Sequence, residues 1–429
     1  MQTLVLEGQL AACTWQRIGA YDPHSAPMIH EQHSNDFILE LGTALHRYGT
    51  PAHRLEGALS AMAETLGVQI QVFSTPTSIM IGFGEPSQQR TSLLRMEPGV
   101  HNLEKLWRVD ELAERLSMGQ VLPDEALREL QAIEAAPNGM GDALTLLSYP
   151  VTTAAATTIF GGSWIDMAVA ALSGFLIGLL ALYVPRTPSG GRLFEFAAAG
   201  VAGTIAHLGS TMDIGASYEP VMLAGVIVLV PGLTLTIAMT ELATRNLLSG
   251  TARLMASMMV FLQIIFGIAL SQEILSRFVG VPLASGGAVT PEWVSVIALG
   301  AACISISIIF RAPSKAFPII VVTAVAGFLS ARYGSQHLEP ELGACLGGFM
   351  AAAISNGYAR ICSRSAMVPL VPALILLVPG SLGFRSLSSL WEQDVVGGID
   401  TAFKMVIVAI SLVVGILLAN AVVLPRRPL

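Results

Sequence analysis

Beyond Asp142 the chain consists almost entirely of apolar runs of about 20 residues, and this pattern is the strongest constraint on its fold. A run of that length crosses the roughly 30 Å hydrocarbon core of a bilayer as a single α-helix. The pattern predicts a polytopic α-helical membrane protein with about ten transmembrane helices. The expected spans are residues 143–162, 166–184, 193–210, 217–240, 254–271, 292–310, 316–332, 341–359, 366–384 and 402–423.

Charged residues are concentrated before these runs. Residues 1–142 hold 27 of the 53 charged residues, although the whole chain is only 12% charged. About one-quarter of the residues of globular proteins are charged, and the part after residue 142 falls far below that fraction. The pattern therefore predicts a water-exposed front domain followed by a lipid-embedded part. The front domain is strongly acidic, and its charge gives no indication of nucleic-acid binding.

Hydrophobic periodicity predicts a small α/β fold for the front domain, residues 1–142. Ser34 is expected to cap a helix that ends at Gly49, and Pro51 occupies the first position of a second helix, where proline is tolerated. Alternating apolar residues predict two strands, and amphipathic patterns predict two further helices. These elements are expected at residues 68–72, 78–83, 101–118 and 123–135.

Neither a cofactor nor a metal site is predicted. The four cysteines are scattered without a CxxC pair, and no GxSxG, HExxH or Walker pattern occurs. The front-domain histidines His33, His46 and His53 leave one alternative open, in which this domain is a membrane-anchored enzyme. The helix break at Gly49 and Pro51 separates His46 from His53, so their spacing does not place them on one helix face.

Basic residues alternate between successive connections, which predicts the orientation of the membrane part. With the front domain inside, ten lie in cytoplasmic connections or the tail: Arg186, Arg192, Arg245, Arg253, Arg311, Lys315, Arg360, Arg364, Arg426 and Arg427. The opposite connections hold four: Arg277, Arg332, Arg385 and Lys404. This positive-inside asymmetry predicts a multi-pass protein of a bacterial inner (plasma) membrane with both termini cytoplasmic. The first thirty residues show no basic segment followed by an apolar one, so no cleaved signal is predicted.

The membrane part contains an internal repeat. Leu229-Val230-Pro231-Gly232 recurs as Leu377-Val378-Pro379-Gly380, and Gly-Phe-Leu occurs at both 174–176 and 327–329. The repeat divides this part into units at residues 143–272 and 290–425. Five spans per unit is an odd number, so the second unit is expected to be inverted relative to the first. Inverted five-helix repeats underlie alternating access, which favours a transporter over a channel or an enzyme.

The two Pro-Gly steps predict where the substrate binds. Proline removes a backbone donor and glycine relaxes the chain, so both helices should break within the membrane. The freed amides could bind a carboxylate and the freed carbonyls a cation or an ammonium group. Irregular backbone at this depth needs protein or water beside it. The predicted substrate-binding residues are Pro231, Gly232, Thr234, Thr236, Glu241, Pro379, Gly380, Ser381 and Arg385.

Titratable residues in the apolar runs are candidates for proton coupling, because charge at that depth is costly. The candidates are Glu241, His207, Glu195 and Glu341. Each also has a structural alternative. Glu241 could pair with Arg245 one helical turn on, His207 could be packed and hydrogen-bonded, and the other two glutamates could stabilise helix N-termini. Arg385 could extend towards the outer surface instead of binding substrate.

At these residues the chain resembles the threonine/serine exporter (ThrE) family. The resemblance is carried by Tyr48-Gly-Thr-Pro-Ala-His-Arg-Leu-Glu56, Val230-Pro-Gly-Leu-Thr-Leu-Thr236 and Leu248-Ser-Gly-Thr-Ala-Arg-Leu254. The second half resembles the partner half of the family, which is a separate protein in some bacteria. The resemblance implies proton-driven export of threonine and serine, or of a dicarboxylate such as succinate. We expect a small-molecule substrate and membrane lipid as partners, no nucleic acid, and leave a homo-oligomer open.

Overall fold

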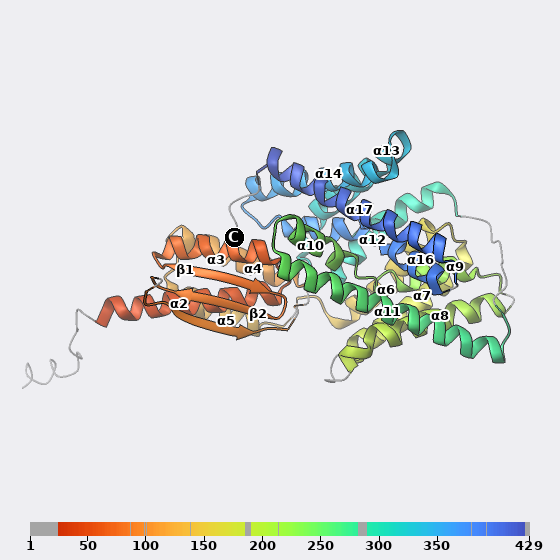
Figure 1. Ribbon diagram of the computed structural model, residues 1–429, viewed down its shortest axis with the longest axis horizontal. Helices are drawn as coiled ribbons and strands as arrows, with labels where there is room; N and C mark the ends of the chain where they lie inside the picture. Colours follow the sequence, from red (N-terminus) through yellow and green to blue (C-terminus); the bar gives the residue numbers. More distant parts are fainter. Residues whose placement is uncertain are drawn as a thin grey trace, which may run out of the picture.

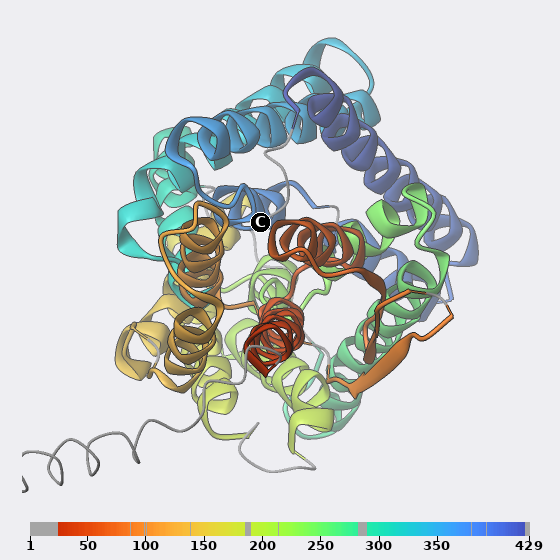
Figure 2. The ribbon, with the colours of Figure 1, turned by 90° about the vertical axis from the view of Figure 1, so that its left-hand side faces the viewer.

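The computed structural model describes residues 25–184, 190–281 and 290–424, apart from residues 86, 98, 100, 138, 213, 379 and 392. The molecule is elongated, with the front domain at one end and a large helical part at the other (Figure 1). Seen along the long axis from the front-domain end, the first two front-domain helices, drawn in red, project onto the middle of the helical part (Figure 2).

The front domain combines four helices with a three-stranded antiparallel sheet. The helices are α2 (Ser25–Arg47), α3 (Ala52–Leu66), α4 (Leu103–Ser117) and α5 (Pro123–Ala135), and the strands are β1 (Ile70–Thr75), β2 (Ser78–Phe83) and β3 (Arg90–Arg95). The strand order is β1-β2-β3, and Ile81 pairs with Val72 on one side and Ser92 on the other. Ile79 and Ile81 are fully buried while Met80 is exposed, as the two-residue period of a strand requires.

One prediction for this domain is wrong, and one strand was missed. Ser34 does not cap a helix, because α2 begins at Ser25 and Ser34 lies buried within it. The polar start of α2 carries no apolar stripe, so periodicity alone did not reveal it. The third strand, β3, was not predicted at all.

Twelve helices, α6 to α17, and one short 3-10 helix make up the rest of the described chain. They are α6 (Asp142–Ile159), α7 (Trp164–Tyr183), α8 (Gly190–Thr211), α9 (Tyr218–Val226), α10 (Gly232–Ala243), α11 (Leu247–Phe278), α12 (Glu292–Ile309), η2 (Ser314–Ala316), α13 (Phe317–His337), α14 (Pro340–Cys362), α15 (Met367–Leu377), α16 (Gly380–Trp391) and α17 (Val395–Val422). Within the described residues, six segments are long and apolar enough to cross a membrane. The chain is therefore a helical membrane protein with several apolar spans.

The helices α6–α11 recur in the same order as α12–α17, each beginning about 150 residues after its counterpart. Their packing recurs too. Helix α7 packs on α8 and α9, and α8 packs on α11; correspondingly α13 packs on α14 and α15, and α14 packs on α17. Each half also interrupts a helix at its Pro-Gly step, between α9 and α10 and between α15 and α16.

Glycines allow the same close helix approach in both halves. A Cβ at Gly267 of α11 would lie 2.3 Å from the carbonyl oxygen of Phe196 on α8. A Cβ at Gly415 of α17 would lie 2.1 Å from the carbonyl oxygen of Cys345 on α14. Both distances are far below van der Waals contact, so only glycine fits at either position.

Candidate functional site

The glycines of the two Pro-Gly steps lie close together. A Cβ at Gly232 would lie 2.5 Å from Cγ1 of Val378, and a Cβ at Gly380 would lie 2.4 Å from Cγ1 of Val230. The contact is reciprocal, because each glycine accepts the valine that stands two residues before the other glycine. The α10 and α16 half-helices thus begin against each other. Pro231 adopts φ −78° and ψ 43° just before α10, whereas Pro379 lies outside the described residues.

A cavity of about 230 Å³ lies between α3 of the front domain and helices α10, α14, α15 and α17. Its polar lining comes from His53, Arg54, Thr236, Thr240, Asn356 and Asn420. Its apolar lining comes from Pro51, Leu233, Ile237, Met367, Leu370, Val371, Leu374 and Ile416. The front domain therefore forms one wall of the cavity, and α10, the helix that follows the first break, forms another.

A cavity of about 80 Å³ lies at the breaks themselves, lined by Thr152, Val230, Gly232, Val378 and Gly380 among others. Leu233 of α10 lines both this cavity and the larger one, so the two cavities adjoin the same helix. Polar side chains are therefore gathered on the front-domain side of the breaks, and the breaks themselves are closed by apolar contacts.

Arg54 separates the larger cavity from a third one. This cavity, of about 40 Å³, is lined by Arg54, Thr50, Asp110, Arg364 and Met367 among others. Burial lowers the pKa of Arg54, while the carboxylate of Asp110 raises it. A guanidinium remains protonated at physiological pH even so. Arg54 therefore presents a permanent positive charge between the two cavities.

His53 contributes a neutral ring to the larger cavity. Burial, aided by the charges of Arg54 and Arg253, lowers the pKa of His53 to about 4. The imidazole is therefore uncharged at neutral pH and can both donate and accept a hydrogen bond. Among the described residues that line this cavity, Arg54 carries the only permanent charge.

Hydroxyl and amide groups complete the polar lining. Thr240 Oγ1 donates to the carbonyl oxygen of Thr236 at 2.8 Å, and Thr236 Oγ1 donates to that of Gly232 at 3.2 Å. Asn356 Nδ2 donates to Asn420 Oδ1 at 2.8 Å and to the carbonyl oxygen of Val423 at 3.0 Å. Each hydroxyl oxygen retains a lone pair that can accept a hydrogen bond from a bound solute.

Glu241, near the end of α10, fastens the front domain to the helical part. Its side chain is fully buried and lies with both carboxylate oxygens 3.1–3.2 Å from Nε of Arg253 on α11. It also accepts a hydrogen bond of 3.0 Å from the backbone N–H of Ala52, at the N-terminus of α3. A carboxylate is stabilised at a helix N-terminus by the helix dipole. The partner of Glu241 is thus Arg253, in place of Arg245, which the sequence had offered as one alternative.

Further polar contacts hold the front domain in place. Ser249 Oγ on α11 donates to the carbonyl oxygen of Ser74 on β1 at 2.8 Å. The N–H of Leu103, at the start of α4, donates to the carbonyl oxygen of Phe310 at 3.1 Å. After α14, Arg364 pairs with Glu111 of α4 at 2.8 Å and lies 4.7 Å from the ring centre of Trp107.

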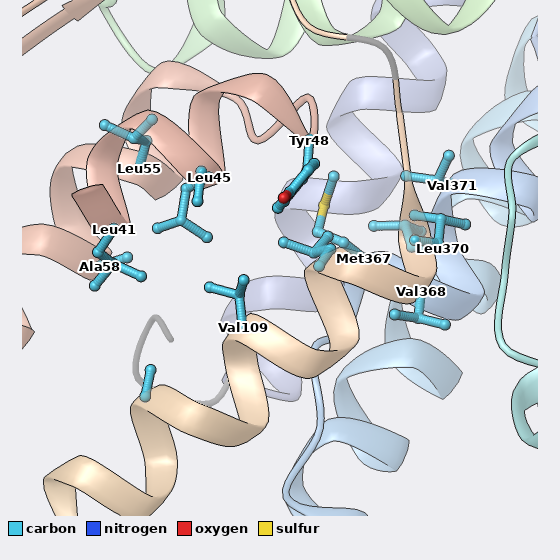
Figure 3. Packing of buried hydrophobic residues seen from close by; sticks show 14 of the residues in the cluster. Leu41, Leu45, Tyr48, Leu55, Ala58, Val109, Met367, Val368, Leu370 and Val371 are labelled. Carbon is cyan, nitrogen blue, oxygen red and sulfur yellow. The ribbon is translucent and has the colours of Figure 1, made fainter. Parts of the chain in front are cut away.

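An apolar cluster joins the front domain to helix α15. Figure 3 shows Tyr48 beside Met367, with Val109 of α4 on one side of them and Val368 and Val371 on the other. These residues belong to one continuous core that runs from the front domain into α10, α12–α15 and α17. The front domain is therefore an integral part of the fold.

Other predicted site residues lie away from the larger cavity. Arg385 is exposed and pairs with Glu219 of α9 at 3.2 Å. Thr234 and Ser381 are partly buried and stand in the first turns of α10 and α16. Of the predicted substrate-binding residues, Thr236 alone among those described lines the larger cavity, while Gly232 and Gly380 form the contact between the breaks.

The other proton-coupling candidates are also separate from this cavity. His207 is fully buried, and its Nε2 lies 2.9 Å from the carbonyl oxygen of Gly280. Glu341 is partly buried in the first turn of α14, and Glu195 is partly buried one turn inside α8. Among the described residues, no group of three histidine, cysteine, aspartate or glutamate side chains is placed to hold a metal ion.

Sequence reasoning missed the contribution of the front domain to the cavity. His53 and Arg54 stand in the Ala52-His53-Arg54-Leu55-Glu56 segment that carried the family resemblance, but the sequence pattern placed this segment in the domain interior. The missed signal was the charge of Arg54 within an otherwise well-packed helix, next to the buried residues Leu55 and Ala58.

Comparison with known proteins identifies the family. The threonine/serine exporter model ThrE matches residues 36–275, and the related threonine/serine exporter model ThrE_2 matches residues 295–422. Proteins named pheromone-regulated membrane protein 10 match along most of the chain. The Candida albicans (strain WO-1) protein is 25% identical over 88% of this chain and 34% of its own length. The Eremothecium gossypii protein is 27% identical, over 82% and 48% respectively.

The chain spans less than half the length of these yeast relatives, which are themselves membrane proteins by name. A bacterial inner membrane therefore remains a prediction. No solved structure matches. The two family models follow one another along the chain as the two sets of helices do, and the resemblance stated from the sequence is confirmed. The chain belongs to the threonine/serine exporter family and carries both halves of that family in one polypeptide.

Proposed function

We propose that the chain is a secondary transporter that exports a small amino acid, threonine or serine, driven by the proton gradient. The observation that carries this proposal is the polar-lined cavity beside the paired helix breaks. Membership of an exporter family favours transport over an enzyme in the front domain.

The size and lining of the cavity suit a small polar solute. Pockets for drug-sized ligands begin at roughly 300 Å³, and this cavity, at about 230 Å³, is smaller. Leu233, Ile237 and Val371 offer apolar surface for a methyl group, and Thr236 and Thr240 offer hydroxyl oxygens. Threonine and serine carry groups that match both surfaces.

The proposed mechanism is alternating access between two inverted five-helix units, with about ten spans in all. The reciprocal contact of Gly232 with Val378 and of Gly380 with Val230 supports it, because a two-fold relation places residue i against j and j against i. The matched packing of α6–α11 and α12–α17 points the same way. If each unit took up the conformation of the other, the substrate path would close on one side of the membrane and open on the opposite side.

Glu241 is the proposed proton carrier, and the front domain is proposed to face the cytoplasm. The carboxylate is buried and holds α10 to both Arg253 and the N-terminus of α3. Protonation would weaken both contacts, because each depends on the negative charge. Proton binding would thus loosen the front domain from the helix that follows the first break.

Uptake into proteoliposomes tests the proposal. Labelled threonine, serine and succinate are offered with and without an imposed pH gradient, to wild type and to the Pro231→Ala/Gly232→Ala variant. The matched control is Pro150→Ala, which changes a proline within α6 and leaves both Pro-Gly steps intact. We expect gradient-dependent uptake of threonine or serine by wild type and the control, and none by the double variant.

Uptake of succinate alone would replace the amino acid with a dicarboxylate as substrate and keep the transporter. Gradient-independent flux would reject proton coupling and indicate a passive path. Normal transport by a correctly inserted double variant would refute the role of the broken helix.

A further inference from the structure

We infer that Arg54 of the front domain binds the carboxylate of the transported solute, so that the front domain forms part of the substrate site. The inference rests on the proposed function. It adds that the substrate site is formed by the front domain together with the membrane helices. It also names the required chemical group: the solute must be a small carboxylic acid.

The charge balance of the cavity supports this assignment. Arg54 lines the cavity together with neutral groups, and the described lining contains no aspartate or glutamate. His53 is uncharged at neutral pH because its pKa is lowered to about 4. Within the cavity lining, a solute carboxylate would therefore meet one positive charge and no negative one, because the nearest carboxylate that acts on Arg54, that of Asp110, lines the neighbouring cavity. A charge-assisted pair with a guanidinium is roughly twice as strong as a neutral hydrogen bond and is geometrically specific.

The position of the guanidinium is fixed from both sides. Asp110 lines the neighbouring cavity with Arg54, and its carboxylate interacts favourably with the guanidinium. Arginine has five N–H donors, so it can serve Asp110 and a solute at once. Leu55 and Ala58 are buried on the same helix, and Ala52 is tied to Glu241. The side chain therefore extends from a helix start that is held by the membrane part.

The rest of the lining is placed to receive the other end of an amino acid. Asn356 and Asn420 offer amide groups, and Thr236 and Thr240 offer hydroxyl oxygens that can accept from an ammonium group. The helix bearing these threonines begins at Gly232, at the contact between the two breaks. A solute bridging Arg54 and α10 would connect the front domain to the moving part of the proposed mechanism.

The test compares threonine with threoninol, which replaces the carboxylate by a hydroxymethyl group. Full-length protein in proteoliposomes takes up labelled threonine while either unlabelled compound competes. For wild type we expect threonine to compete at least roughly 10- to 100-fold better than threoninol, as loss of a charge-assisted contact predicts. The variants are Arg54→Gln, which removes the charge, and Arg54→Lys, which keeps it. Arg47→Gln is the matched control, because Arg47 is exposed and pairs with Glu134 at 3.0 Å.

We expect Arg54→Gln to raise the KM for threonine by roughly 10- to 100-fold and to remove the preference over threoninol. Arg54→Lys should recover part of both, and Arg47→Gln should behave as wild type. A folded Arg54→Gln protein that keeps its KM and its preference overturns the inference and leaves the transporter intact. Equal competition by both compounds in wild type also overturns it, whether or not the variants fold. Absence of any threonine, serine or succinate uptake by wild type overturns the proposed function and the inference together.

Discussion

The contact between the two Pro-Gly breaks makes a sharp energetic prediction. Gly232→Ala places a methyl group 2.5 Å from Cγ1 of Val378, where real carbon atoms do not approach below about 3.0 Å. Either the valine side chain or one half-helix must move. Overpacking of this kind costs typically 1–3 kcal/mol.

The identity of the clashing group allows a specific rescue. Val378→Ala removes two methyl groups and should cost about 1–2 kcal/mol by itself, at ~0.8 kcal/mol per buried carbon. It also removes the atom that Gly232→Ala would strike. The double variant should therefore be more stable than the sum of the single effects by about 1–3 kcal/mol, a typical coupling for residues in contact. The reciprocal contact predicts that Val230→Ala rescues Gly380→Ala in the same way.

The assay is the apparent melting temperature, and the half-life at fixed temperature, of purified full-length protein in detergent. Half-life is included because large proteins often unfold irreversibly. The controls are the crossed double variants, which pair each glycine substitution with the valine that it does not contact. The side chain of Val230 does not lie within 4 Å of a Cβ at Gly232. The stability effects of Gly232→Ala and Val230→Ala should therefore add within about 0.5 kcal/mol. Equal coupling in matched and crossed pairs, or no coupling in either, would refute the reciprocal contact.

Three further predictions concern the docking of the front domain. Burial lowers the pKa of His101 to about 4, whereas an unfolded histidine titrates near 6.5; stability is thus complete above about pH 6.5 and lost as the pH falls towards 4. Melting temperatures from pH 4 to 8 should show this loss shrinking in His101→Gln but not in the control His33→Gln. Glu241→Gln removes the fully buried member of its ion pair and leaves the mostly buried Arg253 uncompensated, so it should cost about 3–5 kcal/mol and abolish gradient dependence. Glu273→Gln, in an exposed pair, should cost under about 1 kcal/mol. Ser249→Ala removes a buried hydrogen bond between domains and should cost about 1 kcal/mol and speed proteolysis of the front domain; an unchanged digestion rate would argue against docking there.

The helical part was predictable because lipid leaves few solutions. A chain in hydrocarbon must satisfy its backbone internally, so an apolar run of span length forms a helix whatever its neighbours are. The break at Pro231 was predictable for the same local reason, since proline lacks the donor that a continuous helix needs. In contrast, β3 has only two apolar residues, Leu93 and Leu94, and its identity as a strand depends on pairing with β2.

The cavity could not be predicted, because its walls are brought together only by tertiary packing. Arg54 and Asn420 stand at opposite ends of the sequence, and neither has a periodic pattern that points to the other. The partner of Glu241 shows the same limit. The i+4 rule offered Arg245 as an alternative partner, but the chain turns there with φ 66°. Helix α11 then runs back along α10 and brings Arg253 to the carboxylate. A local rule cannot anticipate a reversal of the chain.

In the proposed function, the substrate site and the proton site both involve the first turn of α3 in the front domain. Ala52 binds the proposed proton carrier Glu241 through its N–H, and two residues later Arg54 faces the cavity. Moving a two-state equilibrium from 1:99 to 99:1 takes about 5.5 kcal/mol. The combined free energy of a buried charge pair and a few hydrogen bonds of about 1 kcal/mol each is of the size needed for that shift. On this proposal, protonation of Glu241 would free the first turn of α3 from α10, and a carboxylate bound by Arg54 would attach the same turn to α10 through the solute. The two events act in opposite directions on one contact, and a transporter needs such a linkage to couple the proton gradient to the movement of its substrate.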